Sequence, residues 1–242
     1  MCIRDRYGGK FKETLQVTNE TSVKETGDEA QILSKLDFPF YIDRNRVRAV
    51  KKLTKDHDCD VIISDDGLQH YKMGRHIEIA VIDGKRRFGN NLTFPAGPLR
   101  ESKNRLNSVD FIVNNSGPTE EDEYLMNISP SNFVHLKSGK SYSIDKWPMH
   151  NQIHAVAGLG NPGRFFDLLD KLGFDSIRHP FPDHHNFSSS DIFYLDHLPI
   201  VMTEKDASKC KDFDNNKIWY LTIDADVTNK FIDKLDKKLK SI

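Results

Sequence analysis

The sequence predicts an α/β fold with a mostly parallel sheet, helices on both of its faces, and a smaller α/β domain at the C-terminus. Short runs rich in β-branched residues alternate with segments whose apolar residues recur at helical spacing, which is typical of βαβ units. The 242 residues, 37% of them hydrophobic and 29% charged, suffice for one large domain or two modest ones.

In the first half of the chain, a helix is predicted at 27–36, where Asp28 and Glu29 lie in the first turn and suit the helix dipole. A second helix is predicted at 45–57, where apolar residues have helical spacing among basic ones. Strands are predicted at 39–42, 61–63, 77–82 and 111–113. Residues 1–6 show neither the start of a helix or strand nor the apolar core of a signal peptide.

Polar stretches at 116–122 and 137–141 suggest a domain boundary, so we expect a core domain at 1–140 and a smaller domain at 141–242. Further strands are predicted at 153–157, 200–202 and 218–223, and further helices at 165–172 and 230–240. In the last helix, apolar residues recur every four positions with lysines between them. A helix docked on the sheet is the favoured interpretation, and a basic membrane-surface helix is the alternative.

Composition excludes several classes of protein. The net charge of −1 argues against a global basic field for nucleic acid. No apolar run approaches the ~18 residues that a membrane span requires. The three cysteines are too few and too widely spaced for a disulfide scaffold or a zinc cluster.

The motif at 61–70, VIISDDGLQH, places Asp65 and Asp66 at the end of a predicted strand. Ligands bind at the carboxyl edge of open α/β sheets, and an apolar strand that ends in aspartate is the Walker B arrangement, in which the carboxylate holds magnesium on a nucleotide. Gln69 and His70 follow within one turn and are candidates for orienting a phosphate or a metal-bound water. An ordinary Asp-Asp-Gly turn is the alternative.

The motif at 95–101, PAGPLRE, combines a stiff loop with an Arg-Glu pair. Arg100 offers a bidentate donor for phosphate oxygens, and Glu101 offers a further magnesium ligand. Taken alone, this segment favours the alternative, a surface turn with an exposed salt bridge.

Two segments contain candidates for proton transfer. Asp28 follows a glycine at a helix start, and it is either a helix cap, which this segment alone favours, or a general base. His184 and His185 lie in the segment PDHHNF at 182–187, and on an extended chain at most one of them faces a given site. A histidine paired with a carboxylate handles protons, whereas ligand spacing disfavours zinc.

The loop Gly158–Gly163 matches the dinucleotide fingerprint G-x-G-x-x-G. The expected acid is missing from the end of the next strand, because Asp175 begins that strand, and Pro162 removes a backbone donor. A helix N-terminus that holds another phosphate or packs at a domain junction is an equally good interpretation. The segment 203–206, TEKD, is typical of a helix start, either near a ligand edge or simply capped and solvated.

Together these motifs resemble those of the tetraacyldisaccharide 4'-kinase family, the lipid A 4'-kinases of Gram-negative bacteria. The matching segments follow the family's order at 7–10, 27–29, 65–70, 95–101, 158–166, 182–184 and 203–207. The resemblance implies a P-loop NTPase-like fold whose smaller C-terminal domain closes over a larger nucleotide-binding domain. It also implies transfer of the ATP γ-phosphate to the 4'-hydroxyl of a tetraacyldisaccharide 1-phosphate, giving lipid IVA, with ATP and Mg²⁺ as cofactors.

The resemblance also assigns roles to individual residues. Asp28 matches the family's catalytic base, and His184 matches the histidine partner of that base in the second domain. The other matches are a Walker B-like pair and further active-site positions. We expect catalytic roles for Asp28, His184, Asp66 and Arg100, cofactor contacts from Gln69 and His70, and magnesium binding by Asp65, Asp66 and Glu101.

One part of the family pattern is not matched. The family has a Walker A loop, G-x-x-x-x-G-K-[ST], and before it a hydrophobic helix, ahead of the segment where this sequence begins. The segment 8–10, GGK, is no substitute, because Phe11 follows the lysine and no predicted strand precedes it. We therefore expect residues 1–6 to be foreign to the family pattern, and the chain by itself to have little kinase activity.

The resemblance implies a lipid substrate and a membrane surface as partners, with the protein peripheral at the cytoplasmic face of the bacterial inner membrane. We expect a monomer and no nucleic-acid partner. Two alternatives remain open: an NAD-dependent oxidoreductase that uses Gly158–Gly163, and a non-catalytic module that binds membranes through its basic C-terminal helix.

Overall fold

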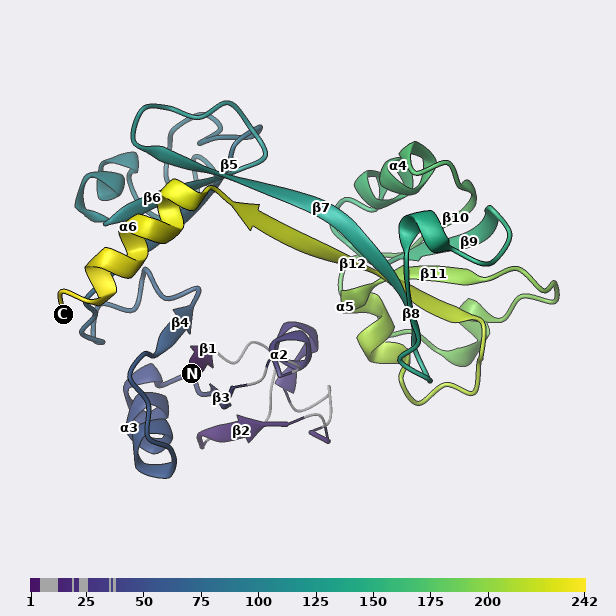
Figure 1. The fold of residues 1–242 in the computed structure, drawn as a ribbon, viewed down its shortest axis with the longest axis horizontal. Coiled ribbons are helices and arrows are strands. Elements are labelled where there is room, and N and C mark those ends of the chain that lie inside the picture. The colour runs from purple at the N-terminus through teal and green to yellow at the C-terminus, as the bar shows by residue number, and fades with distance from the viewer. Residues whose placement is uncertain (5–12, 19, 22–25, 35, 37) are drawn as a thin grey trace. The chain divides into compact units, whose positions relative to one another are not determined.

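The chain forms two compact units in the computed structural model (Figure 1). Unit 1 consists of residues 1–67 and 130–222, and unit 2 of residues 68–129 and 223–242. The structure describes all residues except 5–12, 19, 22–25, 35 and 37, and at 28, 29 and 31 it describes the backbone alone. The predicted motif at 7–10 therefore lies outside the described residues, and the predicted domain boundary near residue 140 stays a prediction.

A four-stranded sheet in unit 1 contains a strand that the sequence did not reveal. Its order is β2 (Leu15–Val17), β3 (Phe40–Ile42), β1 (Cys2–Arg4), β4 (Ile63–Asp65). The prediction that residues 1–6 begin no strand is wrong, because β1 pairs in parallel with both β3 and β4. Three residues carry no periodicity, so the pairing on both sides, rather than the local sequence, determines this strand.

Two helices accompany this sheet, and both were predicted. They are α2 (Asp28–Leu33) and α3 (Arg46–Asp56). Asn45 caps α3, and its side chain accepts a hydrogen bond of 3.1 Å from the backbone N–H of Arg48. Such a cap contributes roughly 1 kcal/mol, which explains why the helix begins at the residue after Asn45.

A second, larger sheet has the order β10-β9-β11-β12-β7-β6-β5, with β8 paired to β7. The strands of this sheet are β5 (Ile79–Asp83), β6 (Phe111–Asn115), β7 (Glu123–His135), β8 (Ser141–Ser143), β9 (Gln152–Ala157), β10 (Asp175–Pro180), β11 (Ile200–Thr203) and β12 (Ile218–Val227). Strands β10, β9, β11 and β12 pair in parallel, as do β5, β6 and β7. The predicted mostly parallel α/β fold is confirmed.

Strand β7 was not predicted, and both β7 and β12 contribute residues to each unit. Serine, asparagine and proline interrupt the apolar alternation of β7, which hides the period-2 signal on which strand prediction depends. The remaining helices are α4 (Gly163–Lys171), α5 (Glu204–Ala207), α6 (Asn229–Leu239) and the 3-10 turns η1 (Lys103–Ser108), η2 (Ile144–Lys146), η3 (Ser189–Ile192) and η4 (Ser208–Cys210).

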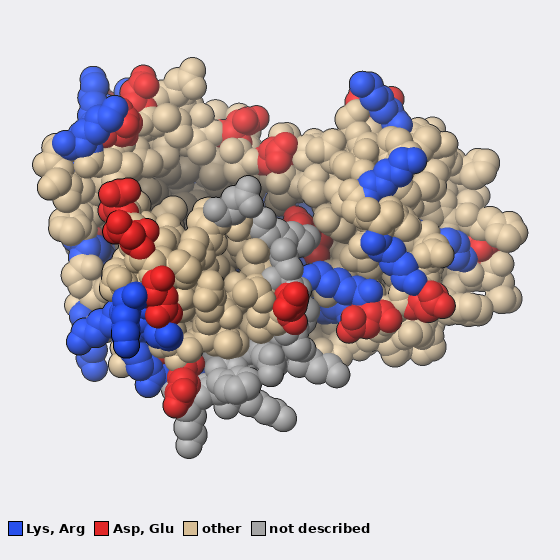
Figure 2. Space-filling view, turned by 60° about the horizontal axis from the view of Figure 1, so that its bottom comes forward, with Lys and Arg blue, Asp and Glu red and all other residues tan. Residues whose placement is uncertain are grey.

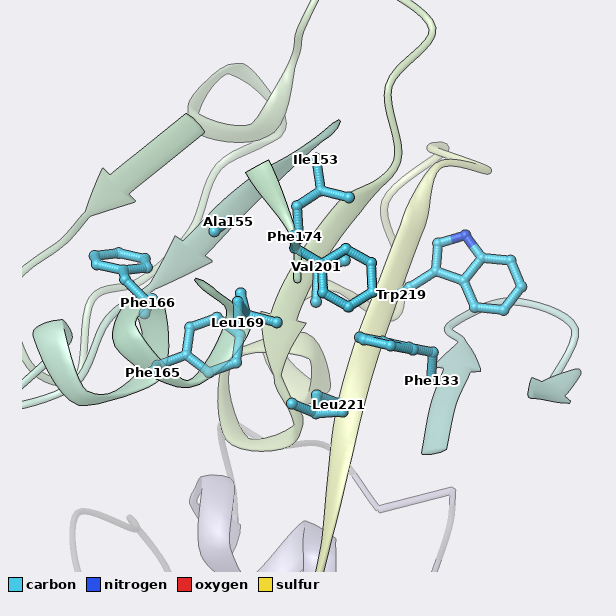
Figure 3. Close-up of a cluster of buried hydrophobic side chains, with 11 residues drawn as sticks. Phe133, Ile153, Ala155, Phe165, Phe166, Leu169, Phe174, Val201, Trp219 and Leu221 are labelled. Carbon is cyan, nitrogen blue, oxygen red and sulfur yellow. The ribbon is translucent and has the colours of Figure 1, made fainter. Parts of the chain in front are cut away.

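Apolar side chains cover both faces of the larger sheet where its strands β9 and β11 lie in unit 1. Figure 3 shows Phe165 and Leu169 of α4 directed toward the strands that carry Ala155 and Val201, and all four side chains are buried. On β11, Val201 belongs to this cluster, whereas Ile200 and Met202 belong to a second one. Because successive strand residues face opposite sides, this division shows a sheet that is buried on both faces, as expected for parallel strands.

Helix α6 packs on the sheet of unit 2. The ring of Phe231 is buried, with ring centroids 5.4 Å from Phe111 and 5.5 Å from Tyr124. At the outer end of the helix, Lys238 forms an ion pair with Asp110. The prediction of a C-terminal helix docked on the sheet is therefore confirmed.

Charges of both signs are interspersed on the surface shown in Figure 2. Ion pairs join charged side chains within each unit, such as Lys137 with Asp214 in unit 1 and Arg87 with Glu120 in unit 2. Pairing of this kind limits the reach of any single-sign field. None of the helices in the described part of the chain is both long enough and apolar enough to cross a membrane.

A cluster of polar contacts around Glu123 stabilises the start of β7 in unit 2. Arg87 lies 2.7 Å from a carboxylate oxygen of Glu123, and the side-chain amide of Asn114 donates to Glu123 at 2.7 Å. The Glu123 side chain is only 4% exposed. The hydrogen bond from Arg87 is the main cause that lowers the pKa of Glu123 to about 2.

This lowered pKa predicts a pH-dependent contribution to stability. Because the pKa of Glu123 falls from 4.5 to about 2 on folding, the stabilisation is complete above about pH 4.5 and is lost as the pH falls toward 2. We expect Glu123→Gln to lower the free energy of unfolding by roughly 1.5–3 kcal/mol at pH 7, the range for hydrogen bonds to charged groups. Urea unfolding followed by circular dichroism between pH 7 and pH 3 measures this.

The exposed neighbour Glu121 supplies the control, since Glu121→Gln should change the free energy of unfolding by less than about 0.5 kcal/mol. The gap between the Glu123→Gln variant and the parent should narrow as the pH falls below 4.5. A gap that stays constant from pH 7 to pH 3 would contradict the role of the ionised carboxylate.

Candidate functional site

A buried arginine fixes the end of β4, where the Asp65-Asp66 pair lies. One terminal nitrogen of Arg46, Nη1, donates to Ser64 Oγ at 2.7 Å and to the carbonyl of Asp65. The other, Nη2, donates to the carbonyl of Asp66 at 3.0 Å. Arg46 is 2% exposed. Its buried guanidinium therefore holds the backbone carbonyls of the predicted Walker B-like pair in place.

The side chains of the pair differ in their surroundings. Asp65 Oδ2 lies 2.8 Å from Arg4 Nη1, and the Asp65 side chain is 39% exposed. Asp66 is exposed and has a positive φ of 48°. A Cβ at Gly67 would lie 2.6 Å from Ser64 Oγ, so glycine is required there. The segment is a tight strand-end turn that presents both carboxyl groups at least partly to solvent.

In unit 2, the structure brings together two of the predicted site residues. Gln69 Nε2 donates to Glu101 Oε2 at 2.9 Å, and the hydroxyl of Tyr71 donates to Glu101 Oε1. The hydrogen bond from Tyr71 is the main cause that lowers the pKa of Glu101, and that from Gln69 is the next. Glu101 is therefore held as a carboxylate by these two donors. Arg100, which precedes it, is exposed.

Two residues at these places were missed by the sequence reasoning. Tyr71 follows the predicted Gln69-His70 pair directly, but nothing in the sequence indicates that it contacts a loop about thirty residues further on. Arg46 had a usable signal: it shares a helical stripe with Ala49 and Leu53, the other buried residues of α3. An arginine within an apolar stripe faces inward and requires buried acceptors.

The carboxyl ends of β9, β10 and β11 carry a second group of candidates in unit 1. These strands are parallel neighbours, so the loops that follow them share one edge of the sheet. His184, in the loop after β10, has a side chain that is 58% exposed and a positive φ of 57°. Its ring Nε2 lies 3.9 Å from Asp183 Oδ1, which accepts a hydrogen bond of 2.9 Å from the His184 backbone N–H.

The adjacent histidines do point to different surroundings, but the reason is not the predicted extended chain, since His184 has a left-handed backbone conformation. The ring of His185 packs against Phe181 and Phe187, and its Nε2 lies 3.2 Å from Asp191. His185 is thus a packed structural residue, whereas His184 stays at the surface of the loop.

Asp28 occupies the first position of α2. The cap position itself belongs to Gly27, which has a φ of 85°. The interpretation of Asp28 as the helix cap is therefore wrong. Asp28, His184 and the Asp65-Asp66 pair all belong to unit 1, and Gln69, His70, Arg100 and Glu101 belong to unit 2.

The glycine loop after β9 is occupied by a protein carboxylate. The N–H of Gly158, the first glycine of G-x-G-x-x-G, donates to Asp206 Oδ2 at 2.9 Å. Asp206 also receives a hydrogen bond of 2.8 Å from Thr203 Oγ1, which caps α5. The prediction of a capped helix start at 203–206 is therefore confirmed, but Asp206 is 0% exposed, so the helix start is not solvated at that residue. A loop whose leading N–H binds an internal carboxylate is also a poor cradle for dinucleotide phosphates.

Comparison with known proteins assigns the chain to a family. Residues 4–240 match the family model described as tetraacyldisaccharide-1-P 4'-kinase. This match includes every candidate residue of the site. The chain belongs to the tetraacyldisaccharide-1-P 4'-kinase family.

Relatives and a solved structure agree with this assignment. A tetraacyldisaccharide 4'-kinase of Ruthia magnifica is 45% identical over 96% of this chain and 74% of its own length. One from Coxiella burnetii is 42% identical over 98% of this chain and 70% of its own length. The crystal structure of LpxK from Aquifex aeolicus in complex with ATP matches with a TM-score of 0.83 at 24% identity, over 99% of this chain and 78% of that one. The kinase-like fold is therefore confirmed, and the oxidoreductase alternative is wrong.

The position of Arg46 predicts a large effect of a conservative substitution. Lysine has no planar fork of donors, so Arg46→Lys cannot serve the hydroxyl of Ser64 and both aspartate carbonyls together. We expect the free energy of unfolding to fall by roughly 1–3 kcal/mol, the cost of unsatisfied buried polar groups. Urea unfolding measures this, and amide exchange at residues 63–67 should accelerate.

The matched control is Arg44→Lys, because Arg44 lies just ahead of the same helix and is exposed. That change should alter stability by less than about 0.5 kcal/mol. Equal effects of the two substitutions would contradict a special role for the Arg46 guanidinium.

The Glu101 cluster predicts a change in titration. Tyr71→Phe removes the main hydrogen bond that lowers the pKa of Glu101, so that pKa should rise toward its ordinary range. Carboxyl ¹³C NMR titration of Glu101 measures the shift. Tyr142→Phe, a matched change in unit 1, should leave the Glu101 titration in place. A Glu101 pKa that does not move in the Tyr71→Phe variant would show that this hydroxyl does not bind the carboxylate.

Proposed function

We propose that this chain acts in the ATP-dependent phosphorylation of the 4'-hydroxyl of tetraacyldisaccharide 1-phosphate, which gives lipid IVA in lipid A biosynthesis. The observation that carries this proposal is the family match over residues 4–240. The relatives named tetraacyldisaccharide 4'-kinase support it, as does the ATP complex of the Aquifex aeolicus structure. The enzyme class is that of a lipid kinase.

The proposed division of labour follows from the demands of phosphoryl transfer. The reaction requires positioning, positive charge at the phosphates and a group that accepts the hydroxyl proton. We assign the base to Asp28 and its histidine partner to His184, with Asp183 beside that histidine. Arg100 is exposed and suits phosphate oxygens, and Gln69 and His70 contact the nucleotide.

Magnesium suits the donor chemistry of three proposed ligands. Asp65, Asp66 and Glu101 offer carboxylate oxygens, the ligands that Mg²⁺ prefers, and Glu101 is held in its ionised form. Within the described ranges, no three histidine, cysteine, aspartate or glutamate side chains form a ready-made metal cluster. When bound, magnesium neutralises charge on the transferred phosphoryl group.

The substrate class determines the proposed partners and location. A disaccharide with four acyl chains resides in a bilayer, so we place the protein at the membrane surface, as a peripheral monomer on the cytoplasmic face of the bacterial inner membrane. The docked position of α6 argues against the C-terminal helix as a separate membrane anchor. Vesicle flotation of the chain with and without residues 230–242 tests this, since loss of binding on deletion would support an anchor there.

The assignment of the base predicts a specific kinetic defect. We use the chain joined to a Walker A segment of the family, called here the extended chain, so that the assay includes a phosphate-binding loop. Asp28→Asn should lower kcat of the extended chain by about 100-fold or more, as loss of a general base does, with the Kd for ATP within twofold. A radiolabelled phosphate-transfer assay and ATP titration measure the two quantities.

The adjacent change Glu29→Gln is the control and should leave kcat within about threefold. Turnover that persists in the Asp28→Asn variant would remove Asp28 from the role of base.

A further inference from the structure

The loop that carries His184 is bound on both sides by one short helical segment. Asp183, before His184, lies 3.6 Å from Lys205 Nζ. The carbonyl of His185, after it, accepts a hydrogen bond of 3.2 Å from Lys209 Nζ. The two lysines are four residues apart in the segment formed by α5 and η4, so adjacent turns of this segment contact the two neighbours of His184.

A fully buried carboxylate anchors that segment. Asp206 is 0% exposed, and the side chain of Lys209 is 8% exposed, with its Nζ 3.3 Å from Asp206 Oδ1. The second oxygen, Oδ2, accepts hydrogen bonds from the N–H of Gly158 and from Thr203 Oγ1. Asp206 thus connects the ends of β9 and β11, and Lys209 extends the connection to the loop after β10.

The space around the anchor is closely filled. A Cβ at Gly158 would lie 3.2 Å from both Asp206 Oδ1 and the carbonyl of Pro182. Lys209 Nζ lies 5.7 Å from the centre of the Phe187 ring. Little room therefore remains at Gly158 for a side chain between Asp206 and the start of the His184 loop.

The loop requires such support because of its backbone. His184 has a φ of 57°, a left-handed conformation that is uncommon for a residue with a side chain and persists only when its surroundings hold it. His184 is also 58% exposed, so its own side chain contributes little burial to hold the loop. Groups of the neighbouring segment contribute to this support.

We propose that Asp206 and Lys209 are positioning residues for phosphoryl transfer, which hold the His184 loop in the geometry that the reaction requires; this inference rests on the proposed function of His184. A buried ion pair is weak evidence for stability, because hydrophobic residues can fill the same space as well. This pair, however, also binds two backbone groups at the edge of the sheet, the N–H of Gly158 and the carbonyl of His185. It therefore determines where the loop lies.

The decisive experiment separates placement from stability. Lys209→Met removes the contact to the His185 carbonyl. Ile192→Val removes a methyl group from a fully buried side chain in the cluster that contains Phe187, so it lowers Tm and loosens packing while the hydrogen bonds of Asp206 and Lys209 stay in place. In the extended chain, we expect Lys209→Met to lower kcat roughly 10- to 100-fold, the effect of a small misplacement of a reacting group. KM for ATP should stay within twofold, and Ile192→Val should keep the parent kcat.

Two further variants keep the test decisive if Lys209→Met folds poorly. Lys209→Arg preserves the charge. Its decrease in log kcat should be at most half of the decrease that Lys209→Met causes. Asp206→Asn replaces one acceptor oxygen with an NH2 group, which then faces either Lys209 Nζ or the Gly158 N–H and Thr203 hydroxyl donors, and it should reproduce the loss. Hydrogen exchange of residues 181–187 in the original chain should accelerate at least fivefold in Lys209→Met, relative to Ile192→Val.

The outcomes distinguish this inference from the proposed function. If Lys209→Met and Asp206→Asn keep the kcat of Ile192→Val, the positioning role is overturned and His184 is unaffected. If His184→Ala keeps the parent kcat, the role of His184 in the proposed function fails, and the positioning role fails with it. Loss of kcat in His184→Ala together with loss in Lys209→Met, and faster exchange at 181–187, supports both.

Discussion

Polar backbone groups at the ends of parallel strands must find partners, and in unit 1 buried charged side chains supply them. Arg46 donates to the carbonyls of Asp65 and Asp66, and Asp206 accepts from the N–H of Gly158. The two cases are complementary, because a buried cation satisfies carbonyl groups and a buried anion satisfies an amide. In both, the desolvated charge is compensated only when the loop follows one path, so each buried charge determines the loop on which the candidate site depends.

This arrangement explains why Asp66 and His184 are exposed while the charged groups that support their loops are buried. Asp66 and His184 lie at the surface with positive φ angles, whereas Arg46 and Asp206 beneath or beside them are buried. Reactive side chains that must meet a large substrate cannot also be the groups that fix their own backbone. Exposed side chains are the ones that can contact ligands, and buried side chains hold the exposed ones in position.

The helices α3, α4 and α6 could be predicted from the sequence because packing of one face gives them apolar residues at helical spacing. The strands β9 and β11 could be predicted because burial of both faces makes them short, nearly continuous apolar runs. Strand β1 could not, since three residues become a strand only through partners on both sides. At the site, Gln69 and Glu101 were predicted separately, and their contact depends on tertiary structure. The burial of Asp206 was missed because local sequence makes Thr203 a helix cap but does not indicate what covers it.

The left-handed backbone at His184 has a consequence for how this position tolerates change. Glycine would adopt the same φ without steric cost, so relief of backbone strain taken alone favours replacing this histidine. Selection for turnover favours keeping it. A position of this kind is where a stability–activity trade-off becomes visible, and stabilising substitutions found there in a screen without an activity filter would come at the expense of catalysis.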